Sequence, residues 1–179
     1  MSKNVLIISS SLRNHSNSEA LAQKFMQGAL DAGHKAEIIS LKGKKIGFCT
    51  GCLACSNTQK CVIRDDSTYI TEKMLNADVI AFATPVYYYG MSGQLKVLLD
   101  RANPLYSSDY KFRDICLLAC AAEDEKTTVD GTVTGIMGWI DCFSKVELKG
   151  TVFAGGVNDA GDIKGHNALE KAYALGQQL

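Results

Sequence analysis

The sequence lacks an excess of charge of either sign. Its 179 residues include 19 basic and 19 acidic side chains, so the formal net charge is +0. Proteins that bind nucleic acid depend on positive charge to attract the phosphate backbone. The balance therefore argues against nucleic acid as a partner. A content of 46% hydrophobic and 21% charged residues is typical of an ordinary globular protein.

Long apolar runs are also missing. No segment approaches the ~20 consecutive apolar residues that a membrane-spanning helix needs, and the apolar run near the N-terminus is too short for the core of a signal peptide. We therefore expect no membrane contact and a cytoplasmic location. In a reducing compartment, the seven cysteines are expected to be metal ligands, redox groups or small core residues, and not a frame of disulfides.

Two common phosphate-binding motifs are absent. Without GxGxxG, a dinucleotide bound in the Rossmann manner is disfavoured, and without GxxxxGK followed by Ser or Thr, so are ATP and GTP. The sequence also shows no internal repeat, low-complexity tract or linker. We therefore expect one domain over residues 1–179.

Short apolar runs alternate with amphipathic segments along the whole chain. Strands are expected at 4–8, 35–41, 78–83, 114–122 and 146–154. Helices are expected at 16–33, 67–76, 91–101, 126–143 and 162–178, with three unfavourable glycines at 131, 135 and 138 inside the fourth. Strict alternation implies right-handed crossovers and a parallel sheet covered on both faces. The sequence thus predicts a doubly wound α/β domain with five strands in the order 2-1-3-4-5.

Ligands of such sheets bind beyond the carboxyl ends of the strands, so the loops after strands one, three and four are the informative ones. The first, residues 9–18, reads SSSLRNHSNS and leads into a helix. Free N–H groups and the helix dipole there favour an anion, and hydroxyls suit a phosphate monoester. The alternative is that Ser16 or Asn17 only caps the helix and the other serines are solvated.

The loop after strand three, residues 84–93, reads TPVYYYGMSG. Aromatic and thioether side chains suit a flat, polarisable ring, and glycine permits close approach of the backbone. Alternatively, the tyrosines pack on neighbouring loops or at a subunit interface. Together with a phosphate at the first loop, a flat ring here describes a mononucleotide.

The two loops resemble those of the flavodoxin-like NAD(P)H-dependent FMN reductase family. The likeness runs from NVLIISSSLRNHSNS through ADVIAFATPVYYYGMSGQLKVLLDR to LEKAYALGQQL. It implies a flavodoxin-like fold, FMN as cofactor and NAD(P)H as co-substrate. By this resemblance the phosphate is held by Ser9, Ser11, Arg13, Ser16, Asn17 and Ser18. The ribityl chain or ring is contacted by Pro85, Val86, Tyr87, Tyr88, Gly90 and Met91, and the pocket is completed by Cys120, Ala121 and Ala122. Because the chemistry is the flavin's own, no side chain is expected to act as acid, base or nucleophile.

Residues 48–66, FCTGCLACSNTQKCVIRDD, form a cysteine-rich loop. The spacing C-x2-C-x2-C-x5-C comprises Cys49, Cys52, Cys55 and Cys61. Cysteine thiolates hold iron–sulfur clusters, whereas structural zinc usually takes two separated C-x2-C pairs. The run resembles the motif of the iron–sulfur flavoproteins, a branch of the same family with a 4Fe-4S cluster and FMN. Zinc, redox-active thiols or a purely structural turn remain alternatives.

The other notable residues are expected to be structural. Cys116, Cys120 and Cys142 lie in strand or helix patterns, where cysteine is most often a small buried hydrophobe. Asp100 and Arg101, at a helix end, are expected to form a structural ion pair.

We therefore expect an FMN-dependent oxidoreductase that passes electrons from NAD(P)H or a reduced carrier to a quinone, a flavin or another acceptor, through a 4Fe-4S cluster if one is bound. A flavodoxin-type electron carrier is the alternative, but such carriers are usually acidic and this chain is balanced. A third reading is a mononucleotide-binding regulator with a zinc loop. The electron donor and acceptor are small molecules or proteins, and the resemblance implies a homodimer or homotetramer, since relatives place the flavin at a subunit interface.

Overall fold

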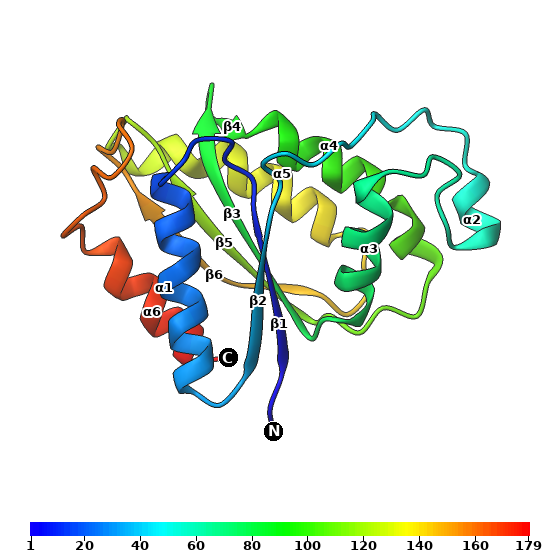
Figure 1. The fold of residues 1–179 in the computed structure, drawn as a ribbon, viewed down its shortest axis with the longest axis horizontal. Coiled ribbons are helices and arrows are strands. Elements are labelled where there is room, and N and C mark those ends of the chain that lie inside the picture. The colour runs from blue at the N-terminus through cyan, green and yellow to red at the C-terminus, as the bar shows by residue number, and fades with distance from the viewer.

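Five long parallel strands form the central sheet, in the spatial order β2-β1-β3-β5-β6 (Figure 1). The computed structural model describes all residues, 1–179. The long strands are β1 (Asn4–Ser9), β2 (Lys35–Ser40), β3 (Val79–Tyr87), β5 (Asp114–Cys120) and β6 (Glu147–Ala154). Counted among themselves they follow the predicted order 2-1-3-4-5. The sequence did not predict β4 (Gly90–Met91), which pairs antiparallel with the end of β3.

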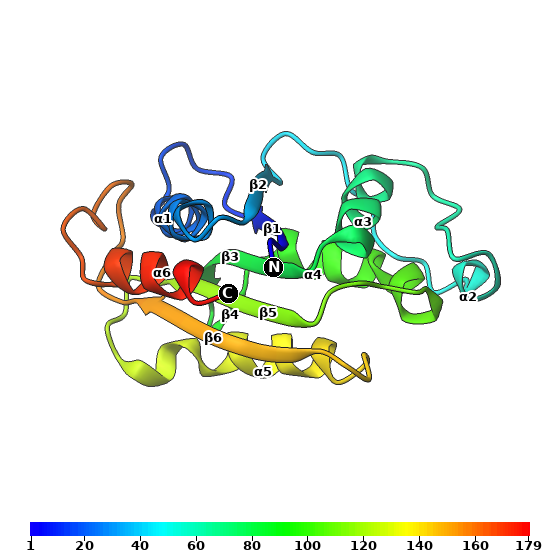
Figure 2. The same ribbon diagram turned by 90° about the horizontal axis from the view of Figure 1, so that it is seen from below.

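Helices cover both faces of the sheet (Figure 2). They are α1 (Asn17–Asp31), α2 (Ala54–Thr58), α3 (Asp66–Asn76), α4 (Gly93–Arg101), α5 (Asp130–Ile140) and α6 (Ala168–Gln177), with 3-10 helices η1 (Asn103–Ser107) and η2 (Lys126–Val129). One apolar core lies between the sheet and the pair α1 and α6. The other lies between the sheet and α3, α4 and α5. The architecture is therefore the predicted doubly wound α/β arrangement.

The burial of its side chains explains why the sequence of β1 is an uninterrupted apolar run. Val5 and Ile7 pack into the core under α1, whereas Leu6 and Ile8 pack into the core under α3. All four are at most 2% exposed. A strand buried on both faces has no polar side to display, so it shows no alternation of apolar and polar residues.

The helix α5 contains three glycines, and two of them let it approach the β3–β4 hairpin. A Cβ added at Gly131 would lie 2.3 Å from the carbonyl oxygen of Tyr89, and one at Gly135 would lie 2.8 Å from Cε of Met91. A Cβ at Gly138 would meet nothing within 4 Å. Glycine at 131 is therefore required by close packing against the backbone, whereas a Cβ at 135 would meet only the flexible end of the Met91 side chain.

The last helix is shorter than the sequence predicts. It begins at Ala168 and not at 162, because residues 158–167 form a loop. Gly161 adopts a φ of 94° in this loop, and its N–H donates to Oδ1 of Asn17 at 3.1 Å. A side chain of α1 thus holds the loop in place, a contact that periodicity alone does not reveal.

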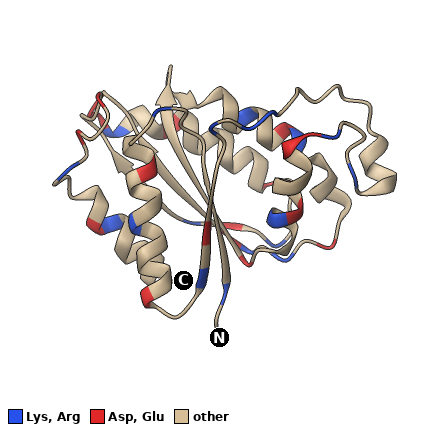
Figure 3. Cartoon of the chain, viewed as in Figure 1, with Lys and Arg blue, Asp and Glu red and all other residues tan.

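Basic and acidic residues are interspersed over the helices and loops, as Figure 3 shows. This agrees with the formal net charge of +0. None of the helices is both long and apolar enough to cross a membrane.

Candidate functional site

A cavity of about 150 Å³ lies at the carboxyl edge of the sheet. Three of the segments around it are those that the sequence singled out, and the fourth follows β6. The lining residues are Ser11, Arg13, Ser16, Asn17, Ser18, Pro85, Val86, Tyr87, Cys120, Ala121, Ala122, Val157, Asn158 and Ala160. Of the residues named from the sequence, Ser9 lies inside β1, 2% exposed, and does not line this cavity.

Ser16 caps α1 and shapes one edge of the cavity. Its Oγ accepts a hydrogen bond from the N–H of Glu19 at 3.2 Å and lies 3.5 Å from Oγ of Ser18. The N–H group of Asn17 has no hydrogen-bond partner within the chain. The helix dipole adds positive potential at the same place. This edge therefore presents hydroxyl and backbone donors that fit a phosphate.

The loop after β6 is held by two residues that the resemblance assigns to phosphate. Nδ2 of Asn17 donates to the carbonyl of Asp159 at 2.9 Å, and Nη1 of Arg13 donates to the carbonyl of Asn158 at 2.7 Å. The side chain of Asn17 is thus engaged with protein, while its backbone N–H stays free. This loop was not predicted from the sequence, where only the segments after strands one, three and four were expected to bind, although ligands bind beyond the carboxyl end of β6 as well.

The three tyrosines lie on the tight hairpin that joins β3 to β4. Tyr87 pairs with Gly90, and Tyr88 and Tyr89 form the turn with φ values of 48° and 62°. Such φ values are costly for residues other than glycine, and strain of this kind is concentrated at functional sites. The tyrosines are 50%, 102% and 60% exposed. Tyr88, Gly90 and Met91 therefore lie beside the cavity and do not line it.

Two of the three cysteines outside the motif are buried, as predicted. Burial raises the pKa of Cys116 to about 12 and that of Cys120 to about 11. Cys120 is therefore a neutral thiol on the cavity wall near pH 7, and not a nucleophile. The prediction is wrong for Cys142, which is exposed.

The four motif cysteines line a second cavity, of about 450 Å³. Cys142 lines it as well, and Trp139 and Phe143 form part of its apolar wall. Figure 1 shows α2, which carries one of these cysteines, at the opposite end of the long axis from α1 and α6.

The fit of a metal to this cavity depends on how far apart the sulfurs are. Nowhere do three or more His, Cys, Asp or Glu side chains come close enough to hold one metal ion. A four-iron cube separates its cysteine sulfurs more widely than a single ion does. Four thiols on the wall of one cavity are the donor set that a 4Fe-4S cluster takes.

The loop that carries the motif is strained on both sides of α2. Leu53 and Gln59 have φ values of 56° and 55°, in the left-handed region. Cys52 directly precedes Leu53, and hydrogen bonds from the backbone of Ala54 and the side chain of Thr50 lower its pKa. A lowered pKa favours the thiolate, which is the form that ligates metals.

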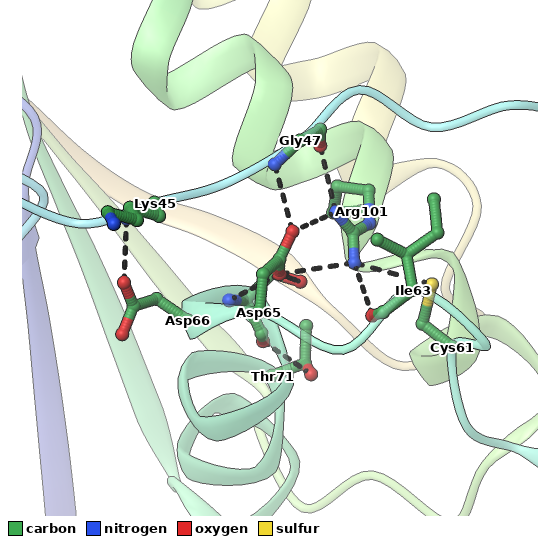
Figure 4. Close-up of polar contacts among 9 residues, drawn as sticks. Lys45, Gly47, Cys61, Ile63, Asp65, Asp66, Thr71 and Arg101 are labelled. Carbon is green, nitrogen blue, oxygen red and sulfur yellow. Dashed lines mark hydrogen bonds and ion pairs between the residues drawn. The ribbon is translucent and has the colours of Figure 1, made fainter.

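A buried guanidinium ties this loop to the end of α4 (Figure 4). Arg101, 1% exposed, donates from Nη1 to Oδ2 of Asp65 at 2.6 Å and to the carbonyl of Gly47 at 2.8 Å. Its Nη2 donates to the carbonyl of Ile63 at 2.8 Å and to Sγ of Cys61 at 3.4 Å. One side chain thereby joins both ends of the cysteine-rich segment.

The ion pair expected between Asp100 and Arg101 is wrong in its partners. Asp100 accepts from Lys96 at 2.7 Å, because neighbours on a helix surface are three or four residues apart.

The carboxylate of Asp65 is the partner of Arg101, and burial alone would raise the pKa of Asp65. Hydrogen bonds from Arg101, from the Ser67 side chain and from backbone N–H groups outweigh this and hold that pKa well below its ordinary value. Arg101 therefore faces a charged carboxylate.

Known proteins share both the fold and the sequence pattern. An iron-sulfur flavoprotein of Methanocaldococcus jannaschii is 41% identical over 101 residues, which cover 56% of this chain and 52% of that protein. Matches to four iron-sulfur flavoproteins span between 42% and 52% of those proteins, so the chain spans about half their length. A proposed NAD(P)H-dependent FMN-containing oxidoreductase of Bacillus subtilis is 29% identical over 187 residues, which cover 96% of this chain and 95% of that protein.

Among solved structures, an NAD(P)H:quinone oxidoreductase from Methanothermobacter marburgensis has the same fold. It aligns with a TM-score of 0.77 at 20% identity, over 99% of this chain and 96% of that one. Residues 3–127, more than half of the chain, match the family described as NADPH-dependent FMN reductase. The chain therefore belongs to the NADPH-dependent FMN reductase family.

Proposed function

We propose that residues 1–179 form one FMN-binding domain that acts as an FMN-dependent oxidoreductase. It takes electrons from NAD(P)H or a reduced carrier and passes them to a quinone, a flavin or another acceptor. The observation that carries this proposal is the cavity at the carboxyl edge, where the hydroxyl-rich start of α1 meets the ends of β3 and β5. Family membership and the description of the Bacillus subtilis relative support NAD(P)H as the donor.

The size of the cavity suggests how FMN would be divided between pocket and surface. Pockets that enclose a whole small ligand measure about 300–1,000 Å³, whereas this one measures about 150 Å³. It has room for the phosphate and part of the ribityl chain. The flavin ring would then extend along the hairpin of Tyr87, Tyr88 and Tyr89, where a nicotinamide or an acceptor can reach it.

The chain's own residues would bind and orient the cofactor. The hydroxyls of Ser16 and Ser18 and the free N–H group of Asn17 would donate hydrogen bonds to the phosphate, and the helix dipole would favour its negative charge. Pro85 and Val86 provide an apolar wall, and Cys120, a neutral thiol, adds to it. When bound, FMN accepts a hydride and releases electrons singly or in pairs. No protein acid or base is required for that transfer.

We propose further that Cys49, Cys52, Cys55 and Cys61 hold a 4Fe-4S cluster. Support comes from their common cavity and from the names of the iron-sulfur flavoproteins that the chain resembles. The cluster would exchange single electrons, and the chain's part is to supply four thiolates on a preformed loop.

A homodimer or homotetramer is part of the same proposal. Three exposed tyrosines lie beside the flavin cavity, and large exposed aromatic side chains are typical of interfaces. The helix α2, which carries Cys55 of the cysteine cavity, and the start of α1, which lines the flavin cavity, lie toward opposite ends of the long axis (Figure 1). An assembly that brings the cysteines of one copy to the flavin of another would shorten the path of the electrons.

The test is the absorption spectrum of protein purified without oxygen, with FMN, iron, sulfide, zinc and the rate of NAD(P)H oxidation measured on the same sample. Flavin with turnover and about four irons per chain supports the proposed cofactor, activity and cluster. Flavin without turnover favours a flavodoxin-type carrier, and absence of flavin contradicts the proposal.

A pair of variants tests the ligands. Cys52→Ser should abolish bound iron while FMN is retained. Cys142→Ser is the matched control, since this cysteine lines the same cavity outside the motif, and it should retain both. Full iron content in Cys52→Ser would exclude Cys52 as a required ligand.

A further inference from the structure

The guanidinium of Arg101 makes more contacts with the cysteine loop than a salt bridge requires. Its side chain is completely buried, and its two terminal nitrogens bond to Asp65, to two backbone carbonyls and to Sγ of Cys61 (Figure 4). Only Nε, also buried, has no partner within the chain. Arg101 lines the same cavity as the four motif cysteines. A cation with an unsatisfied buried donor on that wall suits a negatively charged group beside it.

A second side-chain donor contacts another motif cysteine. Nδ2 of Asn103, two residues further along the chain, donates to Sγ of Cys55 at 2.9 Å. These two are the only side-chain nitrogens in the protein that donate to sulfur. Both come from the junction of α4 and η1, so one rigid element reaches two of the four sulfurs. Asn103 itself is exposed and makes no other side-chain hydrogen bond.

We propose that Arg101 and Asn103 are positioning residues of the four-cysteine site, which hold Cys61 and Cys55 by N–H···S bonds and raise the reduction potential of the cluster. This rests on the proposed function, in which those cysteines ligate iron and sulfide. A cluster that gains an electron becomes more negative. Hydrogen bonds to its sulfurs stabilise that reduced form, so they shift the potential upward.

Asn103→Ala is the most direct variant, because it removes one N–H···S bond from an exposed side chain. The matched control is Gln59→Ala. Gln59 is an exposed amide on the cysteine-rich loop, and it donates to the carbonyl of Ser107 at 2.7 Å and not to sulfur. Iron, sulfide and FMN are assayed on each anaerobically purified protein, and the cluster potential is measured by a redox titration followed by electron paramagnetic resonance. We expect a lower potential in Asn103→Ala at unchanged iron and FMN content, and a wild-type potential in Gln59→Ala.

Arg101→Lys tests the second donor, because it keeps the charge but not the planar fork. Variants around metal ligands commonly lose about 10–100-fold in metal affinity. We expect this variant to lose iron to a chelator about tenfold faster than wild type, with FMN content unchanged. If Arg101→Lys does not fold, the potential of Asn103→Ala decides the matter.

The failures of the two proposals can be told apart. A wild-type potential in Asn103→Ala overturns the positioning role and leaves the cluster intact. A wild-type protein that binds no iron or sulfide refutes the cluster itself, and with it the positioning role, before any variant is compared. A shift of equal size in Gln59→Ala would also overturn the proposal, since loosening of the loop would then explain the result.

Discussion

Replacing Asp65 by Asn tests the energetic importance of the ion pair with Arg101. The substitution preserves size and keeps an oxygen that can accept from the N–H of Ser67, as Asp65 does at 3.0 Å when it caps α3. It removes the negative charge 2.6 Å from Nη1 of Arg101, and it replaces Oδ2, which also accepts from the N–H of Gly47 at 2.9 Å, by an NH2 group. The guanidinium, with a side-chain exposure of 0%, is then buried without a counter-charge.

The expected magnitude follows from the burial of the pair. Removing one partner of a buried ion pair typically costs about 3–5 kcal/mol in the free energy of unfolding. Asp65 keeps 14% side-chain exposure, and Arg101 retains the carbonyls of Gly47 and Ile63, so the lower end of that range, about 3 kcal/mol, applies. For a chain of this length each kcal/mol shifts Tm by about 2–4 °C. The loss in Tm is therefore about 6–12 °C near pH 7.

The effect must also depend on pH. The pKa of Asp65 is lower in the folded protein than its ordinary value of about 3.9 in an unfolded chain. The stability that this carboxylate contributes is complete above the unfolded pKa and is lost as the pH falls toward the folded pKa. The difference between wild type and Asp65→Asn should be full at pH 7 and shrink below about pH 4.

Urea unfolding and thermal melts at several pH values between about 3 and 7 measure both quantities. The control is Asp100→Asn, which breaks the exposed pair with Lys96, whose side chains are 59% and 47% exposed. That pair should contribute about 0.5 kcal/mol or less. A Tm for Asp65→Asn within about 2 °C of wild type, or a difference that does not change with pH, would refute the reasoning.

Two further predictions concern the surroundings of the flavin cavity. Gly131→Ala places a Cβ 2.3 Å from the carbonyl oxygen of Tyr89, so it should lower Tm and displace the hairpin. Gly138→Ala meets nothing within 4 Å and should raise the free energy of unfolding by about 0.5–1 kcal/mol. Thermal melts of the two proteins should therefore show Tm shifts of opposite sign, and shifts of the same sign would contradict the packing argument. The double variant Ser16→Ala and Ser18→Ala removes two hydroxyls from the cavity wall at the start of α1. It should reduce the amount of FMN that copurifies with the protein, as measured by flavin absorption. An unchanged FMN content would place the phosphate elsewhere.

Much of the fold could be predicted because local sequence determines it. The apolar run of β1 and the glycine that follows α1, Gly33 with a φ of 86°, are signals within the segments that they define. The hairpin was harder to predict. Tyr88 and Tyr89 occupy a turn that normally takes Asn and Gly, so the local sequence does not predict the turn. Close packing of α5 against the turn helps to hold this conformation.

The candidate site divides in the same way. The order of strands and helices is defined by the sequence, although β3 continues past its predicted end at 83 to Tyr87. Parallel strands place their carboxyl ends along one edge, so the segments at the ends of β1, β3 and β5 could be expected to meet. The spacing of the four cysteines is likewise a property of the sequence.

Only the tertiary structure decided which distant residues complete these sites. Asn17 fastens the loop after β6 across more than a hundred residues of sequence, and Cys142 reaches the cavity of the motif from the end of α5. Arg101 looks like an ordinary charged helix end until the fold removes it from water. Burial makes a donor without a partner costly. Asp65 and Cys61, which belong to another segment of the chain, accept hydrogen bonds from the terminal nitrogens of Arg101. Such contacts depend on which surfaces lose their water together, and that is determined by packing of the whole chain.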